Sequence, residues 1–173
     1  MKQKIRQEMI LKRKSLDRII KKKYDQSLRE KILADQDFIQ AKVVAFYMPM
    51  ADEVDILDVY QTNKTFLIPR VDKDGMVFVI YDKNIKLKKT KFGTLEPSKA
   101  LDIYEKNIDY MIIPALALSK DLNRIGYGKG YYDQYIKNNR PTKIVGTIYP
   151  FQEIEFEAKD FDQKIDHYYI GEL

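Results

Sequence analysis

Cysteine is absent from the 173 residues, and histidine occurs once, as His167. The lack of cysteine excludes disulfides, thiolate metal sites and mechanisms that use a thiol nucleophile. A single histidine excludes a histidine metal cluster, and we expect His167 to lie in a strand. Any metal or catalytic chemistry must therefore use other side chains.

Long apolar runs are also absent. The first 23 residues are basic and contain no apolar stretch of signal-peptide length, and the later apolar stretches are too short to span a bilayer. No repeat or low-complexity tract marks a linker, and the content of 33% charged and 45% apolar residues is ordinary for a globular protein. We therefore expect one cytoplasmic domain over residues 1–173, a monomer with no membrane partner.

The net charge of +5 is concentrated near the N-terminus. Residues 1–31 hold 12 Lys or Arg against 4 Asp or Glu, whereas the rest of the chain holds 19 against 22. Such a basic segment fits a solvated helix face, a nucleic-acid surface or a site for a polyanionic cofactor. Composition alone leaves these three interpretations open.

Apolar spacing predicts two helices at the start of the chain. The first covers Lys2 to Lys14, and the second begins near Leu16 with Ser15 as its N-cap. Helical periodicity predicts that one stripe of the second helix is buried: Leu16, Ile19, Ile20, Tyr24, Leu28 and Ile32.

A core strand is predicted over Ala41 to Met48, ended by Pro49. It delivers the acidic run Asp52 to Asp55 to a loop at its carboxyl end, which is where ligands bind in open α/β sheets. Asp55 is predicted to cap a helix over Ile56 to Gln61.

Further strands are predicted by β-branched and apolar runs, with a turn at Asp74-Gly75 and a short helix or turn over Ser98 to Tyr104. These strands cover Thr65 to Pro69, Met76 to Tyr81, Met111 to Leu118, Lys143 to Tyr149 and His167 to Ile170. Strands that alternate with helices predict a three-layer α/β/α fold with a mostly parallel sheet.

The stretch from Asp109 to Arg140 combines a buried strand, a glycine loop and a helix over Tyr131 to Asn139. Gly126, Gly128 and Gly130 alternate along the loop, and Arg124 and Lys129 add positive charge. Backbone N–H groups before a helix, with cations beside them, are typical of a phosphate site. A tight turn that needs positive φ is the structural alternative.

Two common phosphate motifs do not match this loop. No Ser or Thr follows Lys129 as in a Walker A loop, and Tyr131 stands where a dinucleotide fingerprint has its third glycine. Asp133, close after the loop, favours a functional role over a simple turn.

The run Ile113 to Ala117, followed by Arg124 to Asp133, resembles the signature of the 5-formyltetrahydrofolate cyclo-ligase (methenyltetrahydrofolate synthetase) family. Two departures are Ser119, where the family usually has Asp, and Asn123, where it usually has Gly. Asn tolerates left-handed backbone, so we expect the turn to persist. The resemblance continues over nearly the whole chain, through Lys2 to Arg6, Glu53 to Asp55, Pro69-Arg70 and Gly93 to Pro97.

The resemblance implies a NagB/RpiA/CoA-transferase-like fold and an enzyme that uses ATP and Mg²⁺ to convert 5-formyltetrahydrofolate to 5,10-methenyltetrahydrofolate. It implies catalytic roles for Lys129, Arg124 and Tyr132, and folate contacts from Met48, Glu53 and Tyr132. It implies magnesium binding by Asp133 and Asp162, with Asp166 as the second choice to Asp162. The ATP-binding residues that it implies are Lys2, Lys4, Arg6, Arg124, Gly126, Gly128, Lys129, Gly130, Tyr131 and Tyr132.

Two other functions compete with this one. A nucleic-acid-binding module would use the basic N-terminal helices, but it would leave the Gly-Lys-Gly loop without a role, and we expect no nucleic-acid partner. Another ATP-dependent small-molecule enzyme would share the loop but give no reason for Glu53.

Overall fold

A six-stranded sheet forms the centre of the computed structural model, which describes residues 1–173. Its strand order is β10-β9-β6-β1-β2-β3, and all neighbouring strands are parallel except the antiparallel pair β2 and β3. The strands are β1 (Val43–Ala45), β2 (Thr65–Asp72), β3 (Gly75–Tyr81), β6 (Tyr110–Ile113), β9 (Lys143–Ile148) and β10 (His167–Ile170). The predicted mostly parallel sheet is therefore confirmed.

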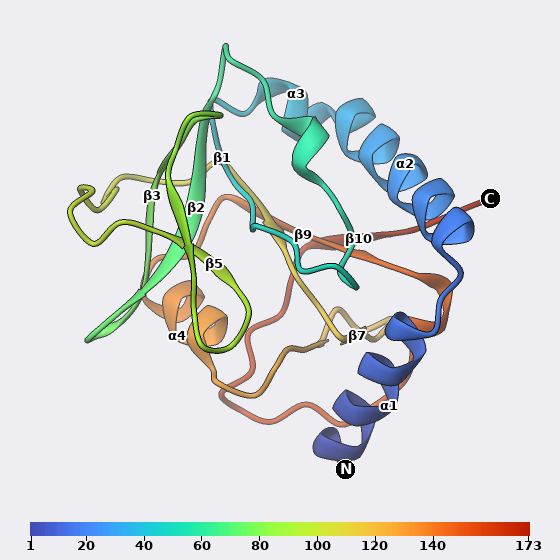
Figure 1. Ribbon diagram of the computed structural model, residues 1–173. Coiled ribbons are helices and arrows are strands. Elements are labelled where there is room, and N and C mark those ends of the chain that lie inside the picture. The colour runs from blue at the N-terminus through green and yellow to red at the C-terminus, as the bar shows by residue number, and fades with distance from the viewer.

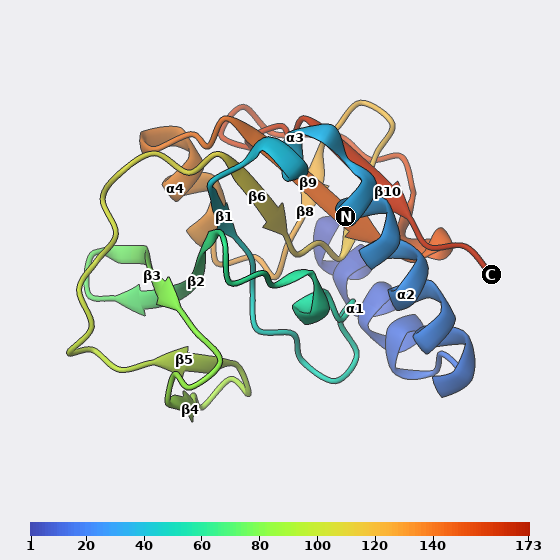
Figure 2. The same ribbon diagram turned by 90° about the horizontal axis from the view of Figure 1, so that it is seen from above.

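Helices cover both faces of this sheet (Figures 1 and 2). Along β1 and β6 the side chains alternate: Val44 and Ile112 pack with α2 (Arg18–Ala34) and α3 (Gln36–Gln40), whereas Ala45 and Met111 pack on the face of α4 (Tyr131–Asn138). This alternation produces the three predicted layers. The name of the fold family stays a prediction.

The predicted strand Met111 to Leu118 divides in two. Pro114 lies directly after β6, and the chain then forms β7 (Ala117–Leu118), which pairs antiparallel with β8 (Arg124–Ile125). Proline lacks a backbone donor, so it suits the point where the ladder ends. The turn between β7 and β8 brings Arg124 back beside the end of β6. The strand predicted over Ala41 to Met48 is also shorter, because regular pairing covers only β1.

The start of the second helix was wrongly predicted. The carboxylate of Asp17 accepts hydrogen bonds from the backbone nitrogens of Ile19 and Ile20, at 2.9 and 3.1 Å, so Asp17 is the N-cap of α2. Ser15 instead ends α1 (Lys2–Lys14). Ile19 is 68% exposed because it lies nine residues before buried Leu28, which is about half a turn away around the helix.

One other helical prediction was too long. The segment predicted as a helix over Ile56 to Gln61 forms only the short 3₁₀ turn η1 (Leu57–Val59), where Asp55 accepts from the backbone nitrogen of Leu57 at 3.1 Å. The helix or turn predicted over Ser98 to Tyr104 is a turn at residues 99–100, and the other 3₁₀ turn is η2 (Pro150–Gln152). No helix has both the length and the apolar character needed to cross a membrane.

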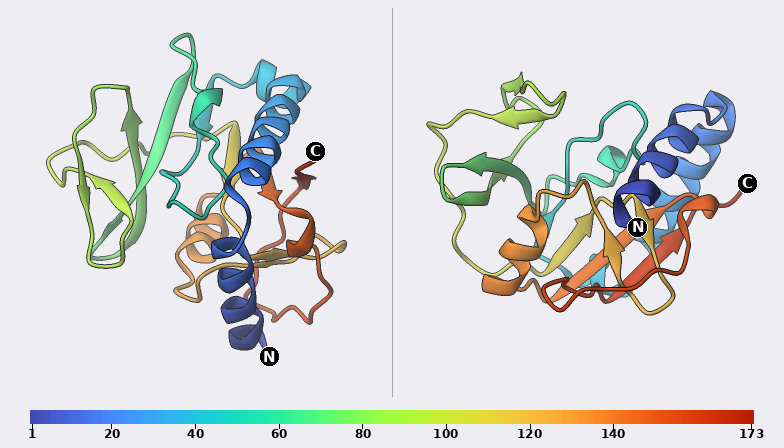
Figure 3. Two further views of the ribbon diagram at one scale, coloured as in Figure 1. Left: turned by 45° about the vertical axis from the view of Figure 1, so that its right-hand side comes forward. Right: turned by 90° about the horizontal axis from the view of Figure 1, so that it is seen from below.

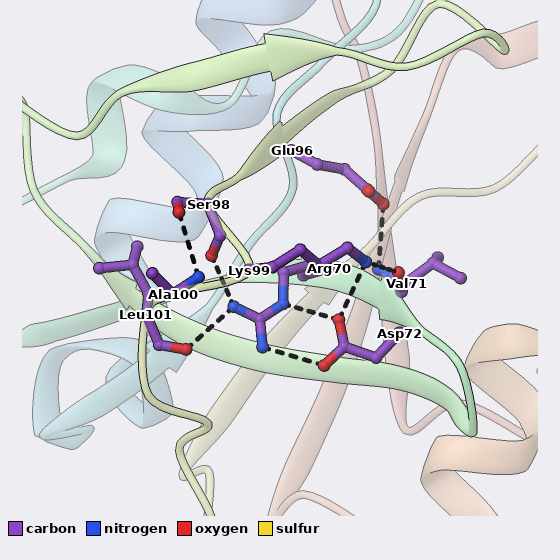
Figure 4. Close-up of polar contacts among 8 residues, drawn as sticks. All are labelled: Arg70, Val71, Asp72, Glu96, Ser98, Lys99, Ala100 and Leu101. Carbon is purple, nitrogen blue, oxygen red and sulfur yellow. Dashed lines mark hydrogen bonds and ion pairs between the residues drawn. The ribbon is translucent and has the colours of Figure 1, made fainter.

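A small hairpin of β4 (Leu87–Lys89) and β5 (Leu95–Pro97) projects beside β2 and β3 (Figure 3). Buried Arg70 of β2 fastens the chain that follows it: the guanidinium contacts both oxygens of Asp72, at 2.7 and 2.9 Å, and the carbonyl oxygens of Ser98 and Leu101 (Figure 4). The carboxylate of Glu96 accepts from the backbone nitrogen of Val71 at 3.0 Å. The hairpin is thus anchored to the sheet at its base.

Candidate active site

The site residues gather at the carboxyl ends of β1 and β6, the two central strands. The chain proceeds from β1 to β2 on one side, and from β6 to β9 and β10 on the other, so the strand order reverses between them. Ligands bind at such a reversal in open α/β sheets. The loop after β1 carries Glu53. Arg124 lies beside the end of β6, because its Nη1 donates a hydrogen bond to the carbonyl oxygen of Pro114 at 2.9 Å.

The glycine loop follows β8 and leads into α4. Gly128 and Gly130 have positive φ of 95° and 74°, and Gly130 is the N-cap of α4. Gly126 serves a different purpose, because a Cβ atom there would lie 2.6 Å from Nη1 of Arg124. The loop combines left-handed backbone at the start of a helix with a closely packed guanidinium, and both favour an anionic ligand.

Arg124 is buried, with 8% of its surface exposed, and its Nε has no hydrogen-bond partner. Its guanidinium carbon lies 5.3 Å from the centre of the Tyr132 ring. Burial lowers the pKa of Arg124, while the charges of Asp133 and Asp162 act in the opposite direction. A buried cationic donor left unpaired is costly, so Arg124 is suited to meet a ligand oxygen.

Helix α1 places two of the predicted cations against the loop. Nε of Arg6 donates to the carbonyl oxygen of Gly126 at 2.8 Å, and its guanidinium lies where a side chain at Gly128 would fall. Lys2 forms an ion pair with Asp162. Lys4 is exposed and forms no ion pair, since it lies about 200° around the helix from Lys2. Its predicted contact with ATP stays a prediction.

The two predicted magnesium ligands lie on neighbouring segments. The carboxylate of Asp133 accepts from the backbone nitrogen of Gln163 at 3.2 Å, and that of Asp162 accepts from the backbone nitrogen of Lys159 at 2.8 Å. Burial works to raise the pKa of Asp162, but these contacts with Lys159 and Lys2 outweigh it and leave the pKa lowered. These contacts therefore favour the ionised form of the carboxylate.

Asp166 has structural partners. Its carboxylate accepts from the backbone nitrogen of Ile144, at the start of β9, and pairs with Arg140, at 2.7 and 3.1 Å. No group of three or more potential metal ligands occurs in the chain. A magnesium site would therefore need oxygens from phosphate and water besides two carboxylates, which is the usual arrangement for Mg²⁺.

Glu53 is buried, with 5% of its surface exposed, in the loop after β1. Its Oε1 accepts from the backbone nitrogen of Met50 at 2.9 Å. Burial raises the pKa of Glu53, although the bond from Met50 and the nearby charge of Arg13 lower it. Glu53 also contributes to the raised pKa of Tyr132, whose main cause is burial. The loop after β1 and the start of α4 thus converge.

The remaining predicted residues pack around this centre. Met48 is half-buried against the core on the α2 face, and Tyr131 and Tyr132 are half-buried against the core on the α4 face. Nζ of Lys129 lies 4.9 Å from the centre of the Phe92 ring, at the tip of the β4–β5 hairpin. The hairpin, whose role could not be deduced from its sequence, therefore contacts the glycine loop.

Sequence reasoning missed Arg13, Asp52 and Tyr127. Nε and Nη2 of Arg13 both donate to Oδ2 of Asp52, at 3.1 and 2.8 Å, and Nη2 also donates to the hydroxyl of Tyr127. A signal was present, because positions 2, 6, 9 and 13 follow helical spacing and so share one face of α1.

Comparisons with known proteins show which family the chain belongs to. A family model described as the 5-formyltetrahydrofolate cyclo-ligase family matches residues 1–169. Proteins named 5-formyltetrahydrofolate cyclo-ligase from Mycoplasma pneumoniae and Mycoplasma genitalium are 30% and 32% identical, and each alignment covers 94% of this chain and 93% of the relative.

Two solved structures have the same fold. The 5,10-methenyltetrahydrofolate synthetase of Mycoplasma pneumoniae superimposes with a TM-score of 0.79 at 27% identity, covering 96% of both chains. The Aquifex aeolicus 5,10-methenyltetrahydrofolate synthetase gives a TM-score of 0.83 at 25% identity, covering 98% of this chain and 89% of that one. The chain belongs to the 5-formyltetrahydrofolate cyclo-ligase family.

Proposed function

We propose that this site converts 5-formyltetrahydrofolate to 5,10-methenyltetrahydrofolate, with ATP hydrolysed to ADP and phosphate. The observation that carries the assignment to these residues is the unpaired, buried Nε of Arg124, in β8 directly before the glycine loop. A phosphate oxygen would satisfy that donor, and the loop lies beside the buried Glu53 carboxylate that would hold the folate.

The chemistry must overcome a poor leaving group, because the formyl oxygen belongs to an amide. In the proposed sequence this oxygen attacks the γ-phosphorus of ATP, the bond to the β–γ bridging oxygen breaks, and ADP leaves. The resulting iminium phosphate is attacked by N10 at the formyl carbon. Loss of the N10 proton and departure of phosphate, which carries away the former formyl oxygen, give the methenyl ring.

The protein contributes positioning and charge to these steps. Arg124 and Lys129 would neutralise the charge that develops on the transferring phosphoryl group, and the N–H groups of the loop at Gly126, Gly128 and Gly130 would donate to phosphate oxygens. Tyr132 would contact the substrate where nucleotide and folate meet. Its ring lies next to the Arg124 guanidinium, and the charge of Glu53 contributes to its raised pKa. Tyr131 would contribute from the first turn of α4.

The folate would be held by Glu53 and Met48. An ionised carboxylate accepts hydrogen bonds, and the pyrimidine edge of a pterin presents several N–H donors. Lys2, Lys4 and Arg6 would contribute the basic end of α1 to the nucleotide phosphates. In support, Arg6 already contacts the backbone of the glycine loop.

The donor set also fits a magnesium ion. Asp133 and Asp162 would hold it, and the ion would supply charge neutralisation on the phosphates of ATP. In the structure Lys2 pairs with Asp162, so a magnesium ion bound there would take the place of this ammonium group and leave Lys2 to the phosphates.

We also propose a cytoplasmic monomer that acts on this small molecule without a nucleic-acid or membrane partner. In support, no recognised nucleic-acid-binding motif accompanies the basic residues of the N-terminal helices. Sedimentation of the purified protein tests the monomer.

Absorbance spectroscopy tests the activity, because the methenyl product has an extended conjugated system that the 5-formyl substrate lacks. The protein incubated with ATP, Mg²⁺ and 5-formyltetrahydrofolate should develop this absorbance band, and omission of ATP should prevent it. If no band develops when all components are present, the proposed function is wrong.

A further inference from the structure

Arg13 joins the three segments that build the site, yet the reaction outlined above gives it no role. It lies in α1, seven residues after Arg6, and its side chain is only 3% exposed. Its contacts reach Asp52, in the loop after β1, and Tyr127, in the glycine loop. One guanidinium therefore connects three segments: α1, which carries the cations proposed to bind ATP, the loop after β1, which carries Glu53, and the glycine loop.

We propose that Arg13 is a positioning residue for folate recognition, which holds the Glu53 carboxylate and the Tyr127 hydroxyl side by side at the pterin site. This inference rests on the proposed function of Glu53. It adds Tyr127 as a substrate contact, with Arg13 acting through Asp52 and Tyr127 rather than by touching the substrate.

Because Arg13 pairs with Asp52, the Glu53 carboxylate remains available to accept hydrogen bonds from a ligand. Asp52 takes two hydrogen bonds from Arg13, whereas Glu53 forms no ion pair and accepts only the backbone bond from Met50 at 2.9 Å. Arg13 still contributes to lowering the pKa of Glu53 through its charge. Glu53 is thus kept close to a cation without being occupied by it, and it can accept from a ligand.

The contact with Tyr127 orients a hydroxyl group. The Tyr127 oxygen accepts from Nη2 of Arg13, so its single proton is directed elsewhere. Arg13 also binds Asp52, the residue before Glu53, so one guanidinium brings the Tyr127 hydroxyl to the loop that carries this carboxylate. The ring is 41% exposed, so a ligand can reach it. A directed hydroxyl beside a carboxylate suits the mixed donors and acceptors along the pterin edge.

Two substitutions separate this role from general packing. Arg13→Lys keeps the positive charge, but one ammonium group cannot reproduce the fixed fork that reaches both partners. Tyr127→Phe keeps the ring and removes only the hydroxyl. Lys14→Gln is the matched control, because Lys14 is the next residue of α1, is exposed and forms no ion pair.

The experiment measures the KM for ATP and for the folate, the dissociation constant of the folate by calorimetry, and the melting temperature. Arg13→Lys and Tyr127→Phe should each weaken folate binding about 10-fold, as expected for a lost hydrogen bond to a charged group, and should leave the KM for ATP within about twofold. The double variant should be little worse than either single variant, because both remove the same contact. Lys14→Gln should match the wild type.

Folate affinity that is unchanged in both variants would overturn the positioning role. Equal loss of ATP and folate affinity together with a lowered melting temperature would assign Arg13 to the fold alone. Calorimetry keeps this test separate from turnover: a wild-type protein that binds the folate without forming the absorbance band contradicts the proposed reaction but still tests Arg13. A wild-type protein that does not bind the folate contradicts both.

Discussion

Replacement of Glu53 by Gln separates the folate site from the stability of the fold. Glutamine has nearly the same shape, and its carbonyl oxygen can still accept from the backbone nitrogen of Met50, the bond that Glu53 makes at 2.9 Å. The change therefore keeps the loop after β1 in place. It replaces one acceptor oxygen by an NH₂ group that faces the N–H donors of the pterin.

The expected loss follows from the charge and the burial of this side chain. Hydrogen bonds to charged groups contribute about 1.5–3 kcal/mol, and every 1.4 kcal/mol changes affinity about tenfold. Since Glu53 is 5% exposed, water cannot replace the lost contact. Glu53→Gln should therefore weaken the binding of the folate substrate by about 10- to 100-fold.

Stability should change in the opposite direction. Burial raises the pKa of Glu53 above its ordinary value, so the ionised carboxylate destabilises the folded chain at pH values above that pKa. The neutral amide removes this cost. We expect the melting temperature of Glu53→Gln at neutral pH to equal or exceed that of the wild type, although folate binding is weaker.

The raised pKa of Glu53 also makes folate affinity depend on pH. As the pH falls through the raised pKa of Glu53, the carboxylate gains a proton and loses acceptor capacity, so folate affinity in the wild type should fall on the acid side. The Gln variant should lack this component. Calorimetry over a pH series, with thermal melts of both proteins, measures both effects. Unchanged folate affinity in the variant at neutral pH would refute the role of Glu53.

Three further substitutions test other parts of the structure. Lys129→Ala should lower kcat more than it raises the KM for the folate substrate, because a cation on the transferring phosphoryl group acts chiefly in the transition state; a raised KM with unchanged kcat would exclude this role. Lys2→Ala combined with Arg6→Ala should raise the KM for ATP several-fold, and exposed Lys22→Ala should have no effect; unchanged ATP use in the double variant would exclude a role of these two cations in ATP binding. Arg70→Met should destabilise the chain by about 1–3 kcal/mol in urea unfolding, because it removes a partly buried ion pair and the hydrogen bonds that fasten the β4–β5 hairpin; an unchanged free energy of unfolding would show that the hairpin does not depend on this anchor.

The sequence was sufficient for the main architecture, because periodicity reports which faces are buried. The alternation of strands and helices predicted the parallel sheet, and the run Asp52 to Asp55 was correctly assigned to the loop after β1. The sequence was less informative about where each helix or strand begins and ends. Both Ser15 and Asp17 can cap a helix, and only the geometry shows that Asp17 receives the two backbone bonds. The apolar run through Pro114 gave no sign that β7 turns back to pair with β8.

The site was predictable where chemistry is local and not where it depends on distant segments. The glycine loop and its cations occur within ten residues, so their spacing was visible. Arg13, in contrast, contacts Asp52 and Tyr127 across 39 and 114 positions of sequence. The contact of Lys129 with Phe92 likewise depends on where the anchored hairpin lies. Helical spacing indicates that Arg13 shares a face of α1 with Lys2 and Arg6, but it does not indicate which distant residues that face contacts.

The path of the formyl oxygen shows whether the formyl group is phosphorylated before the ring closes. If this oxygen takes the γ-phosphoryl group before N10 closes the ring, it must leave as part of phosphate. A reaction with ATP and 5-formyltetrahydrofolate labelled with ¹⁸O in the formyl group should therefore yield one labelled phosphate for each methenyl product, measured by mass spectrometry. Unlabelled phosphate, with the ¹⁸O recovered in water, would contradict the account.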